Sequence, residues 1–402
     1  MDTISRRRFL IASGVTGGAA LVAGSAAVTW SQLHESAASA PLAAGDPVLV
    51  VLTLYGGNDG LNTVIPYTDS AYHGTRPELA YAPGEVLHLD DKLGLNPAMK
   101  GFATLWQSKQ LAIVRGVGYP KPDHSHFRSM DIWQTASPAA PVKTGWIGRW
   151  LDATGDDPVR AVNLGSVLPP LAVGAKTTAA ALNVGKATPL PAQVTAALAG
   201  LGKDDPSDGA TDAMVCAAFR AERKVAATFD KVLSGRQAAG SGSDDLTAQL
   251  DVVAKCVKAG VPTKVYAVSL DGFDTHAGEK ATQQALLGDL DSALSGFLAD
   301  MAKDARGRGV TVLVYSEFGR RVTANASQGT DHGTAGPVFL AGVPVKGGFY
   351  GDQPSLTDLD NGDLKSNVDF RAVYGELVHK VLGGDPHQVL DSVPHELGFI
   401  NA

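Results

Sequence analysis

The sequence has only two cysteines, Cys216 and Cys256, and its basic residues do not outnumber its acidic ones. With 34 Lys and Arg against 41 Asp and Glu, the net charge is −7. We therefore expect no nucleic-acid partner, which a basic surface would attract. Both cysteines fall in stretches that look helical, so either a disulfide between them or two buried thiols fits the sequence.

Beyond its first forty residues the chain has no apolar run of membrane-spanning length, so we expect no stable membrane span in the mature protein. What the chain does have is a well-cored composition. Hydrophobic residues make up 44% and charged residues 19% of its 402 positions, which is typical of a globular protein. This length suits one large domain or two modest ones.

The N-terminal region has the organisation of an export signal. The charged start SRRRFL at 5–10 is followed by an uncharged stretch over 11–33 and by small residues at 36–40. The arginines followed by Phe-Leu resemble a twin-arginine signal. A membrane anchor is the alternative, which the many Gly, Ser and Thr residues disfavour. We expect residues 1–44 to be a signal peptide and cleavage region, read by the twin-arginine export machinery, and the protein to be periplasmic or secreted.

Continuous apolar runs alternate with helical stretches along the chain. Apolar runs, typical of strands buried on both faces, occupy 48–54, 111–117, 264–270, 310–315 and 337–341. Helical stretches occupy 97–108, 125–135, 280–303 and 370–382. This alternation predicts an α/β fold of three layers, in which helices cover both faces of a mostly parallel central sheet.

The middle third of the chain has a different composition. Residues 138–208 are rich in Pro, Ala and Gly, and two amphipathic stretches follow at 211–238 and 245–259. We interpret this region as an inserted, partly helical cap at about 138–262. It would belong to a single domain over residues 45–402.

Polar clusters lie beside the predicted strands, four of them after a strand, where ligands bind in a parallel α/β sheet, and one in the loop before the fifth strand. These clusters are 56–62, 123–126, 271–276, 316–321 and 331–332. Each one alone has an ordinary explanation as a turn, a helix cap or an ion pair. Together they supply the carboxylates and imidazoles that suit zinc or manganese, and a serine at a predicted helix start.

Five of these segments, in order along the chain, resemble the bacterial family labelled domain of unknown function 1501, and the resemblance covers essentially the whole mature chain. The segments are LYGGNDGLNTVIPY at 54–67, SHFRSMD at 125–131, GFDTH at 272–276, SEFGRR at 316–321 and TDHGTAGPVFL at 330–340. That family in turn resembles the alkaline phosphatase and sulfatase superfamily, which implies an alkaline-phosphatase-like fold.

The resemblance implies a set of site residues. Ser125 resembles the nucleophile, with Ser129 as its competitor, and Arg128 or Arg320 would contact ester oxygens. Phe318 stands where the superfamily usually has a histidine. The metal ligands implied by the resemblance are Asp59, Asp274, His276, Glu317 and His332.

Two functions remain open at this stage. The first is an exported hydrolase that binds one or two divalent metal ions, zinc or manganese, and acts on a small anionic phosphate or sulfate ester. The second is a non-catalytic exported binding or accessory protein that keeps the fold, with or without a structural metal. Groups suited to catalysis at the sheet edge favour the first, and Phe318 favours the second.

Overall fold

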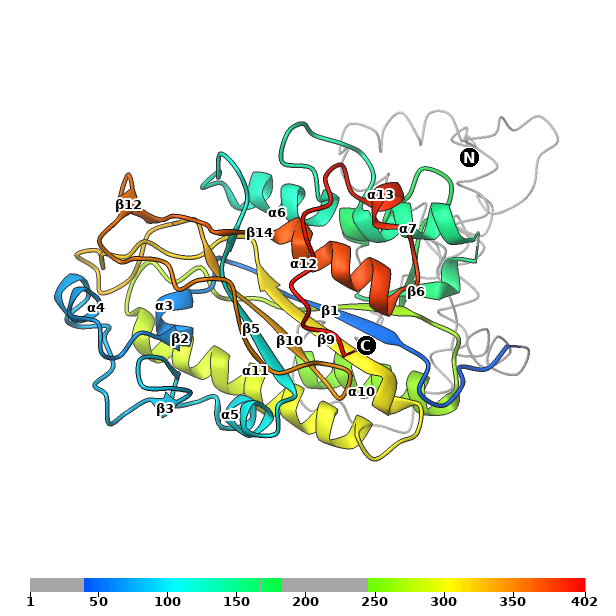
Figure 1. The fold of residues 1–402 in the computed structure, drawn as a ribbon, viewed down its shortest axis with the longest axis horizontal. Coiled ribbons are helices and arrows are strands. Elements are labelled where there is room, and N and C mark those ends of the chain that lie inside the picture. The colour runs from blue at the N-terminus through cyan, green and yellow to red at the C-terminus, as the bar shows by residue number, and fades with distance from the viewer. Residues whose placement is uncertain (1–39, 156, 166–167, 183–244, 402) are drawn as a thin grey trace, which may run out of the picture.

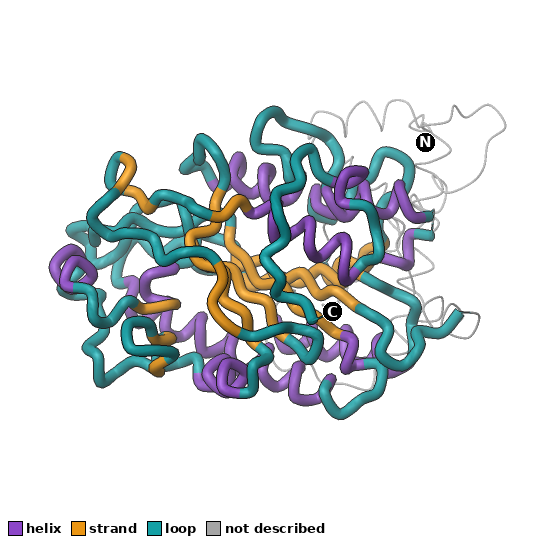
Figure 2. Tube along the Cα trace, in the orientation of Figure 1, coloured by secondary structure: helices purple, strands orange, loops and turns teal. Residues whose placement is uncertain are grey.

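A central nine-stranded sheet with helices on both faces forms the body of the protein (Figure 1). The computed structural model describes residues 40–155, 157–165, 168–182 and 245–401. The strand order is β11-β5-β10-β9-β1-β8-β6-β7, with β14 paired to β5. The tube view shows the strands as one layer between helices and loops (Figure 2). The predicted three-layer α/β fold is confirmed.

One strand of this sheet, β10, runs against all the others. It is antiparallel to both β5 and β9, whereas every other pairing in the described part of the sheet is parallel. The strands are β1 (Val48–Leu54), β5 (Leu111–Gly118), β6 (Ala161–Leu164), β7 (Ala180–Leu182), β8 (Val265–Leu270), β9 (Val310–Ser316), β10 (Gly336–Ala341), β11 (Gly348–Tyr350) and β14 (Val368–Asp369). The reversal places the start of β10 at the carboxyl ends of its neighbours, because Gly336 pairs with Val117.

Residues of β1 divide between two hydrophobic cores, which explains why its sequence is apolar at every position but Thr53. Val48, Val50 and Leu52 belong to one core cluster, and Leu49 and Val51 belong to the other. Successive side chains of a strand point to opposite faces, so a strand covered on both sides needs apolar residues at every position.

Each core is closed by its own set of helices (Figure 1). One face is covered by α5 (Lys100–Gln107), α10 (Leu246–Ala259) and α11 (Glu279–Met301). The other is covered by α6 (His126–Thr135), α7 (Trp146–Thr154), α12 (Phe370–Glu376) and α13 (Pro386–Val389). The predicted strands and the helices expected at 97–108, 125–135, 245–259, 280–303 and 370–382 are thus present, with a π-helix at Leu377–Val381 ending the last one.

Shorter elements extend the ends of this body. Two small sheets form from β2 (Val64–Ile65), β3 (Leu87–His88) and β4 (Gly94–Leu95), and from β12 (Leu359–Asp360) and β13 (Asp363–Leu364). The remaining helices are α3 (Gly60–Thr63), α4 (Ser70–Thr75) and the 3-10 turns Pro158–Arg160, Pro170–Ala172 and Gly307–Gly309.

Within the region 138–262, two strands and the last helix belong to the body of the protein, while the expected cap stays a prediction. Strands β6 and β7 extend the central sheet, because β6 pairs with β8 and β7 pairs with β6. Helix α10 packs beside α11 against the same sheet. These strands are short and lack strong periodicity, so the sequence gave little indication that they belong to a sheet. The helix expected at 211–238 lies outside the described residues.

Two further expectations concern the two cysteines and the N-terminal signal region. Cys256 is a free, buried thiol whose pKa is raised to about 12 by burial, while Cys216 lies outside the described residues. The signal region expected at 1–44 lies almost wholly outside them as well. In the part of the chain that is described, no helix is long and apolar enough to cross a bilayer.

Candidate metal and active site

The loops that follow β1 and β8 pack backbone against backbone at the carboxyl edge of the sheet. Gly56 has a φ of +116°, and a Cβ atom there would lie 2.4 Å from the backbone nitrogen of Asp274. Only glycine fits such a close approach at this φ. The glycine-rich turn after β1 therefore sets the position of Asp274.

Three histidine side chains converge on one carboxylate oxygen. Oδ1 of Asp274 lies 3.0 Å from Nε2 of His276, 3.3 Å from Nε2 of His332 and 3.3 Å from Nε2 of His126. The Nε2 atoms of His276 and His332 lie 2.9 Å apart. We call Asp274 and these three histidines the histidine cluster.

The distances from Asp274 Oδ1 to the three Nε2 atoms, 3.0 to 3.3 Å, are close to the spacing of ligand atoms around a single ion. Ligand atoms that share one tetrahedral zinc ion lie about 3.3 Å apart, given a zinc–nitrogen bond of about 2.05 Å. Three ligand atoms, one each from His126, Asp274 and His332, lie within 4.8 Å of one another. Asp274 is half exposed, with a side-chain accessibility of 50%, so the cluster opens to solvent.

The other ring nitrogen of each histidine faces an oxygen atom. Nδ1 of His332 lies 2.7 Å from the backbone oxygen of His124, and Nδ1 of His126 lies 2.8 Å from Oε1 of Glu317. Nδ1 of His276 lies 3.5 Å from Oδ1 of Asp331. A carbonyl or carboxylate oxygen accepts, so with an ion bound at Nε2 these contacts would hold the proton of each ring on Nδ1.

Nε2 of His126 is buried and has no hydrogen-bond partner. A buried polar atom without a partner is rare and calls for an explanation such as an ion. Its position beside a carboxylate and other imidazoles supplies that explanation. The histidine cluster therefore fits a divalent metal, both in its ligand chemistry and in this orphaned nitrogen.

Charges around the cluster keep Asp274 ionised. Burial alone would raise its pKa, but the hydrogen bond and positive charge of Arg320, with His126 and His276, lower that pKa to about 2. The hydrogen bond to Glu317 raises the pKa of His126 against the effect of burial, and burial lowers the pKa of His332. The cluster thus offers an anionic carboxylate that lies beside three imidazole rings.

Glu317, expected as a ligand, lies behind the cluster. It is buried, and its Oε1 accepts hydrogen bonds from the backbone nitrogen of Gly56 at 2.9 Å and from His126. Its Oε2 accepts from Oγ of Ser316 at 2.9 Å. These contacts direct its carboxylate to the ring of His126, so Glu317 orients a ligand in this arrangement.

Asp59, also expected as a ligand, is not brought to the histidine cluster. Its side chain is fully buried and its Oδ2 pairs with Nη1 of Arg76 at 2.5 Å. Its Oδ1 accepts from the backbone nitrogen of Leu61, capping α3. Glu279 adjoins this pair, and burial together with Asp59 raises its pKa. The carboxylate is therefore committed to an internal ion pair.

Arg320 was expected to contact an ester, but the structure directs its donors inward. Its side chain is fully buried. Nε donates to the carbonyl of Gly57 at 2.6 Å, and Nη2 donates to Oδ1 of Asp274 at 2.8 Å. The remaining contacts are with the carbonyl oxygens of Gly56, Phe273 and Thr330. These bonds tie three loops together, which favours a structural role.

The two serines of α6 lie in opposite surroundings. Ser125 is exposed at the N-cap, where its Oγ accepts from the backbone nitrogen of Arg128 at 3.5 Å. Ser129 is buried, with its Oγ 2.7 Å from the Tyr119 hydroxyl and donating to the carbonyl of Asp123 at 2.6 Å. Only Ser125 is accessible, and it lies between His124 and His126.

Arg128 projects from the first turn of α6 and is partly exposed. Its Nη1 pairs with Oδ2 of Asp131 at 2.5 Å, one helical turn further on. The expected contact with an ester stays a prediction, because the guanidinium carries further donors beyond this pair.

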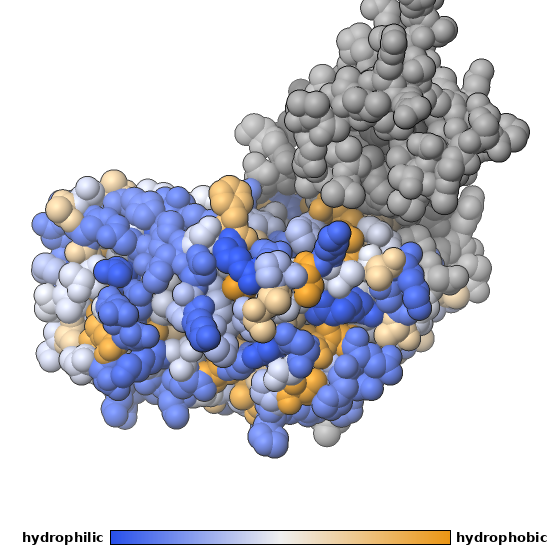
Figure 3. All heavy atoms as spheres, turned by 90° about the horizontal axis from the view of Figure 1, so that it is seen from above, coloured by the Kyte–Doolittle hydropathy of each residue, from blue (hydrophilic) through white to orange (hydrophobic). Residues whose placement is uncertain are grey.

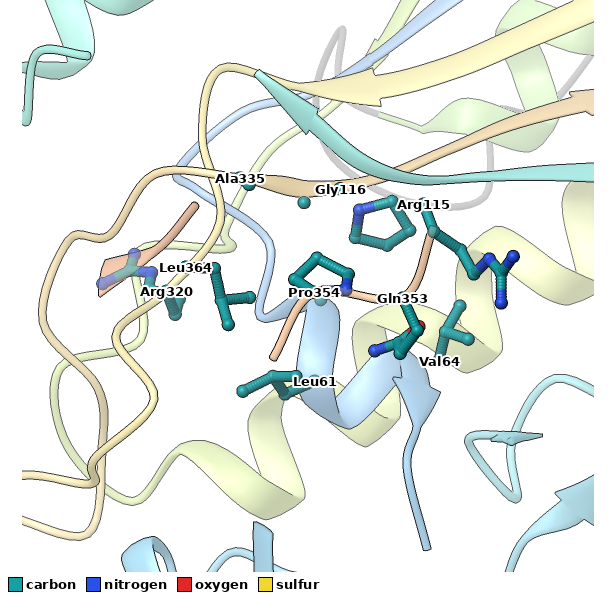
Figure 4. A pocket seen from close by; sticks show the side chains of 12 residues that line it. Leu61, Val64, Arg115, Gly116, Arg320, Ala335, Gln353, Pro354 and Leu364 are labelled. Atoms are coloured by element: carbon teal, nitrogen blue, oxygen red, sulfur yellow. The ribbon is translucent and has the colours of Figure 1, made fainter. Parts of the chain in front are cut away.

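Two cavities of similar size flank the start of α6, and Glu317 lines both. One, of about 600 Å³, is also lined by His126 and Phe127. The other, of about 580 Å³, is also lined by His124 and Phe318. A third pocket, lined by apolar side chains between Arg320 and Arg115, measures only about 30 Å³ and is too small for an ester substrate (Figure 4).

Sequence reasoning missed three residues that shape this edge. His126 was noted only as part of the Ser125 segment, and its spacing from Ser125 on a helix start was the available signal. Arg76 and Glu279 carried no signal, because their burial beside Asp59 depends on contacts between distant segments.

The fold is α/β, and a group of histidine and aspartate side chains that could hold a metal ion lies at the carboxyl edge of its sheet. The chain belongs to the family described as "Protein of unknown function (DUF1501)", which matches residues 46–393. A comparison with curated proteins finds no match.

Several solved structures are similar at low identity. BT1596, a 2-O GAG sulfatase, is 10% identical with a TM-score of 0.36, covering 75% of this chain and 65% of its own. A putative sulfatase from Bacteroides thetaiotaomicron VPI-5482 is 8% identical with a TM-score of 0.37 and the same coverages, 75% and 65%. Alkaline phosphatase from the Antarctic bacterium TAB5 is 13% identical with a TM-score of 0.35, covering 76% of this chain and 94% of its own. The chain thus spans just under two thirds of the first two structures.

Proposed function

We propose that the protein is an exported, metal-dependent hydrolase of phosphate or sulfate esters. The observation that carries this proposal is the histidine cluster, in which the Nε2 atoms of His126, His276 and His332 lie within 3.3 Å of Asp274 Oδ1. Imidazole nitrogens with a single carboxylate are ligands that suit zinc, and manganese is the alternative. We propose these four residues as the metal ligands.

The chain's own residues supply the nucleophile and its surroundings. A bound divalent ion would act as a Lewis acid toward an ester oxygen and lower the pKa of a nearby hydroxyl. Ser125 is the exposed hydroxyl at the start of α6, where backbone N–H groups and the helix dipole favour an anion. Arg128, one turn into the same helix, is proposed to contact the ester oxygens.

The reaction proceeds in two displacements. Ser125 Oγ loses its proton and forms a bond to the phosphorus or sulfur atom, while the bond to the alcohol oxygen breaks and that oxygen leaves with the electron pair and takes up a proton. Water then displaces Ser125 from the enzyme-bound ester, releasing phosphate or sulfate and restoring the hydroxyl. The small anionic ester is thus the proposed partner of this site.

Export rests on the N-terminal sequence. The charged, apolar and small-residue regions of residues 1–44 support passage through the twin-arginine machinery and a periplasmic or secreted location.

A second candidate function is a non-catalytic exported binding protein with one structural metal. Phe318 favours it, since its ring packs 4.9 Å from that of His126 and 5.0 Å from that of His332 and occupies space beside the cluster. Among the residues that the structure describes, no group with metal-ligand spacing lies outside the histidine cluster, in which ligand atoms of His126, Asp274 and His332 lie within 4.8 Å of one another and His276 adjoins them. This arrangement supports one ion rather than two.

Hydrolysis of small esters distinguishes the two functions. Metal-loaded mature protein would be assayed on 4-nitrophenyl phosphate and sulfate, alongside His126→Ala and His88→Ala. His88 is a matched control, because it is an exposed histidine bonded to the carbonyl of Pro83. The hydrolase proposal predicts turnover that only His126→Ala loses. Absence of turnover in a protein that binds metal would favour the binding protein.

A further inference from the structure

Helix α6 presents one face to a groove that begins at the histidine cluster. Phe127, Met130, Asp131 and Gln134 line the groove, and their spacing of three, four and seven residues places them on one side of the helix. The residue that precedes Phe127 is His126. The groove therefore starts at a proposed metal ligand and follows the helix away from it.

Phe127 is the most exposed large apolar side chain of the described residues, with an accessibility of 91%. The space-filling view shows a face that is largely hydrophilic in its described part, with apolar residues in small groups (Figure 3). An aromatic ring held in water on the first turn of a helix adds little to folding, because it buries almost no surface. Contact with a group that enters the groove would bury this ring and stabilise the complex.

The opposite wall of the groove is also apolar. It is formed by the loop after β6, which contributes Leu168, Pro169, Pro170 and Leu171. The volume of about 600 Å³ falls in the range that small-molecule sites occupy. Phe127 therefore faces a cavity with room for a ring system rather than a flat surface.

Acidic residues outnumber basic ones among the residues that line the groove. Asp131, Asp271 and Glu317 line it, and none of its described lining residues is lysine or arginine. Arg128, which pairs with Asp131, does not itself line the groove, so a second phosphate or sulfate group placed here would meet carboxylates and no lysine or arginine among the described lining residues, which is unfavourable. The groove thus disfavours a polyanionic substrate.

We infer that this groove binds the alcohol part of the ester, and that this part is an uncharged aromatic or otherwise apolar group. The inference rests on the proposed hydrolase function, since the groove shares His126 and Glu317 with the surroundings of the proposed metal. A ring on Phe127 gains apolar burial and an offset-stacked or edge-to-face contact. A small hydrophilic alcohol gains neither.

The first test measures binding without requiring turnover. Calorimetric titration of the metal-loaded mature protein would compare 1-naphthylmethylphosphonate with methylphosphonate, in wild type, Phe127→Ala and Val142→Ala. Val142 is the matched control, because it is exposed at 39% and does not line the groove. We expect wild type and Val142→Ala to prefer the naphthyl ligand by about tenfold or more, and Phe127→Ala to lose most of that preference. Equal affinities in wild type, or a preference kept by Phe127→Ala, would overturn the inference.

The second test measures hydrolysis of 1-naphthyl phosphate and methyl phosphate, and of the matching sulfates. Phe127→Ala should raise KM for the naphthyl ester by about tenfold with little change in kcat, because the contact is made equally in substrate and transition state. Hydrolysis without an aromatic preference would overturn the groove assignment and leave the hydrolase intact. A Phe127-dependent binding preference without any hydrolysis would overturn the hydrolase and leave the groove as a ligand site.

Discussion

The Nε2 atoms of His276 and His332 lie 2.9 Å apart, although the residues are 56 positions apart in sequence. They meet because β8 ends, and the antiparallel β10 begins, at the same edge of the sheet. Two imidazole nitrogens at this distance cannot both carry a proton, so a lone pair from at least one points into the cluster. The antiparallel direction of β10 therefore brings His332 to the edge of the sheet where His276 lies.

Glu317→Gln tests how the ligand His126 is held. Glutamine keeps the size of the side chain but removes the charge that faces Nδ1 of His126 at 2.8 Å. Removing a hydrogen-bond partner of a metal ligand typically lowers metal affinity about 10- to 100-fold. We expect Glu317→Gln to bind the metal more weakly by about that factor. Competition against a fluorescent zinc chelator measures it.

Glu396→Gln is the control for this change. Glu396 also accepts from a histidine, Nδ1 of His379 at 2.6 Å, but that histidine is not part of the cluster. Metal affinity should be unchanged in this variant. An equal loss in both variants would show that the effect of Glu317→Gln is not specific to the cluster.

Substitution of the two serines separates chemistry from packing. Ser125→Ala should abolish ester turnover and cost about 1 kcal/mol of stability through the lost helix cap. Ser129→Ala should keep turnover but lower the free energy of unfolding by about 1–3 kcal/mol, because it leaves buried partners at Tyr119 and Asp123 unsatisfied. Turnover assays and urea unfolding measure the two effects. Turnover that survives in Ser125→Ala and fails in Ser129→Ala would reverse the assignment.

The sequence allowed the framework of the fold to be predicted, because its buried strands are continuous apolar runs bounded by glycines and polar clusters. The direction of β10 was not predictable in this way, since an apolar run carries no sign of its orientation. Strands β6 and β7 are four and three residues long. Runs that short give too little pattern to separate sheet from loop.

The types of residue at the site could be predicted from the sequence, but the role of each residue could not. Asp274, His276 and His332 come together as expected at the sheet edge. Arg320 was expected to contact an ester, yet its side chain is fully buried and donates to backbone carbonyls. Asp59 was expected to bind a metal, yet its side chain is fully buried and paired with Arg76. Burial of charged residues depends on partners from distant segments, which local sequence cannot reveal.

Glu279→Gln tests the buried group beside Asp59. Burial and Asp59 raise the pKa of Glu279 above its ordinary value of 4.5, so the folded protein keeps a proton that the unfolded chain loses. The stabilisation is present at low pH and is lost as pH rises above 4.5 toward the raised pKa. The free energy of unfolding of the wild type should therefore fall as pH rises from about 5 to 8. Glutamine has no such proton, so the fall in Glu279→Gln should be smaller by at least about 1 kcal/mol.

Urea unfolding at several pH values measures this difference. The exposed Glu78 provides the control, because Glu78→Gln should follow the wild-type pH profile. Parallel profiles for Glu279→Gln and wild type would contradict a protonated Glu279 in the folded state.

Arg320→Lys tests the structural role of the buried guanidinium. Lysine cannot reproduce the bonds to Gly57, Thr330 and Asp274, and a buried partner would be left unpaired. We expect a loss of about 3–5 kcal/mol in the free energy of unfolding. Arg321→Lys, at a neighbouring side chain that is 42% exposed, should change it by less than about 0.5 kcal/mol. Equal, small effects in both variants would contradict the structural role.

Elemental mass spectrometry of the mature protein, purified without chelator, tests the central claim most directly. Wild type and His88→Ala should carry about one zinc or manganese ion per chain, and His276→Ala/His332→Ala should carry none while remaining folded by circular dichroism. A wild-type protein that stays free of metal after loading, or a double variant that retains it, would contradict the assignment of the histidine cluster as a metal site.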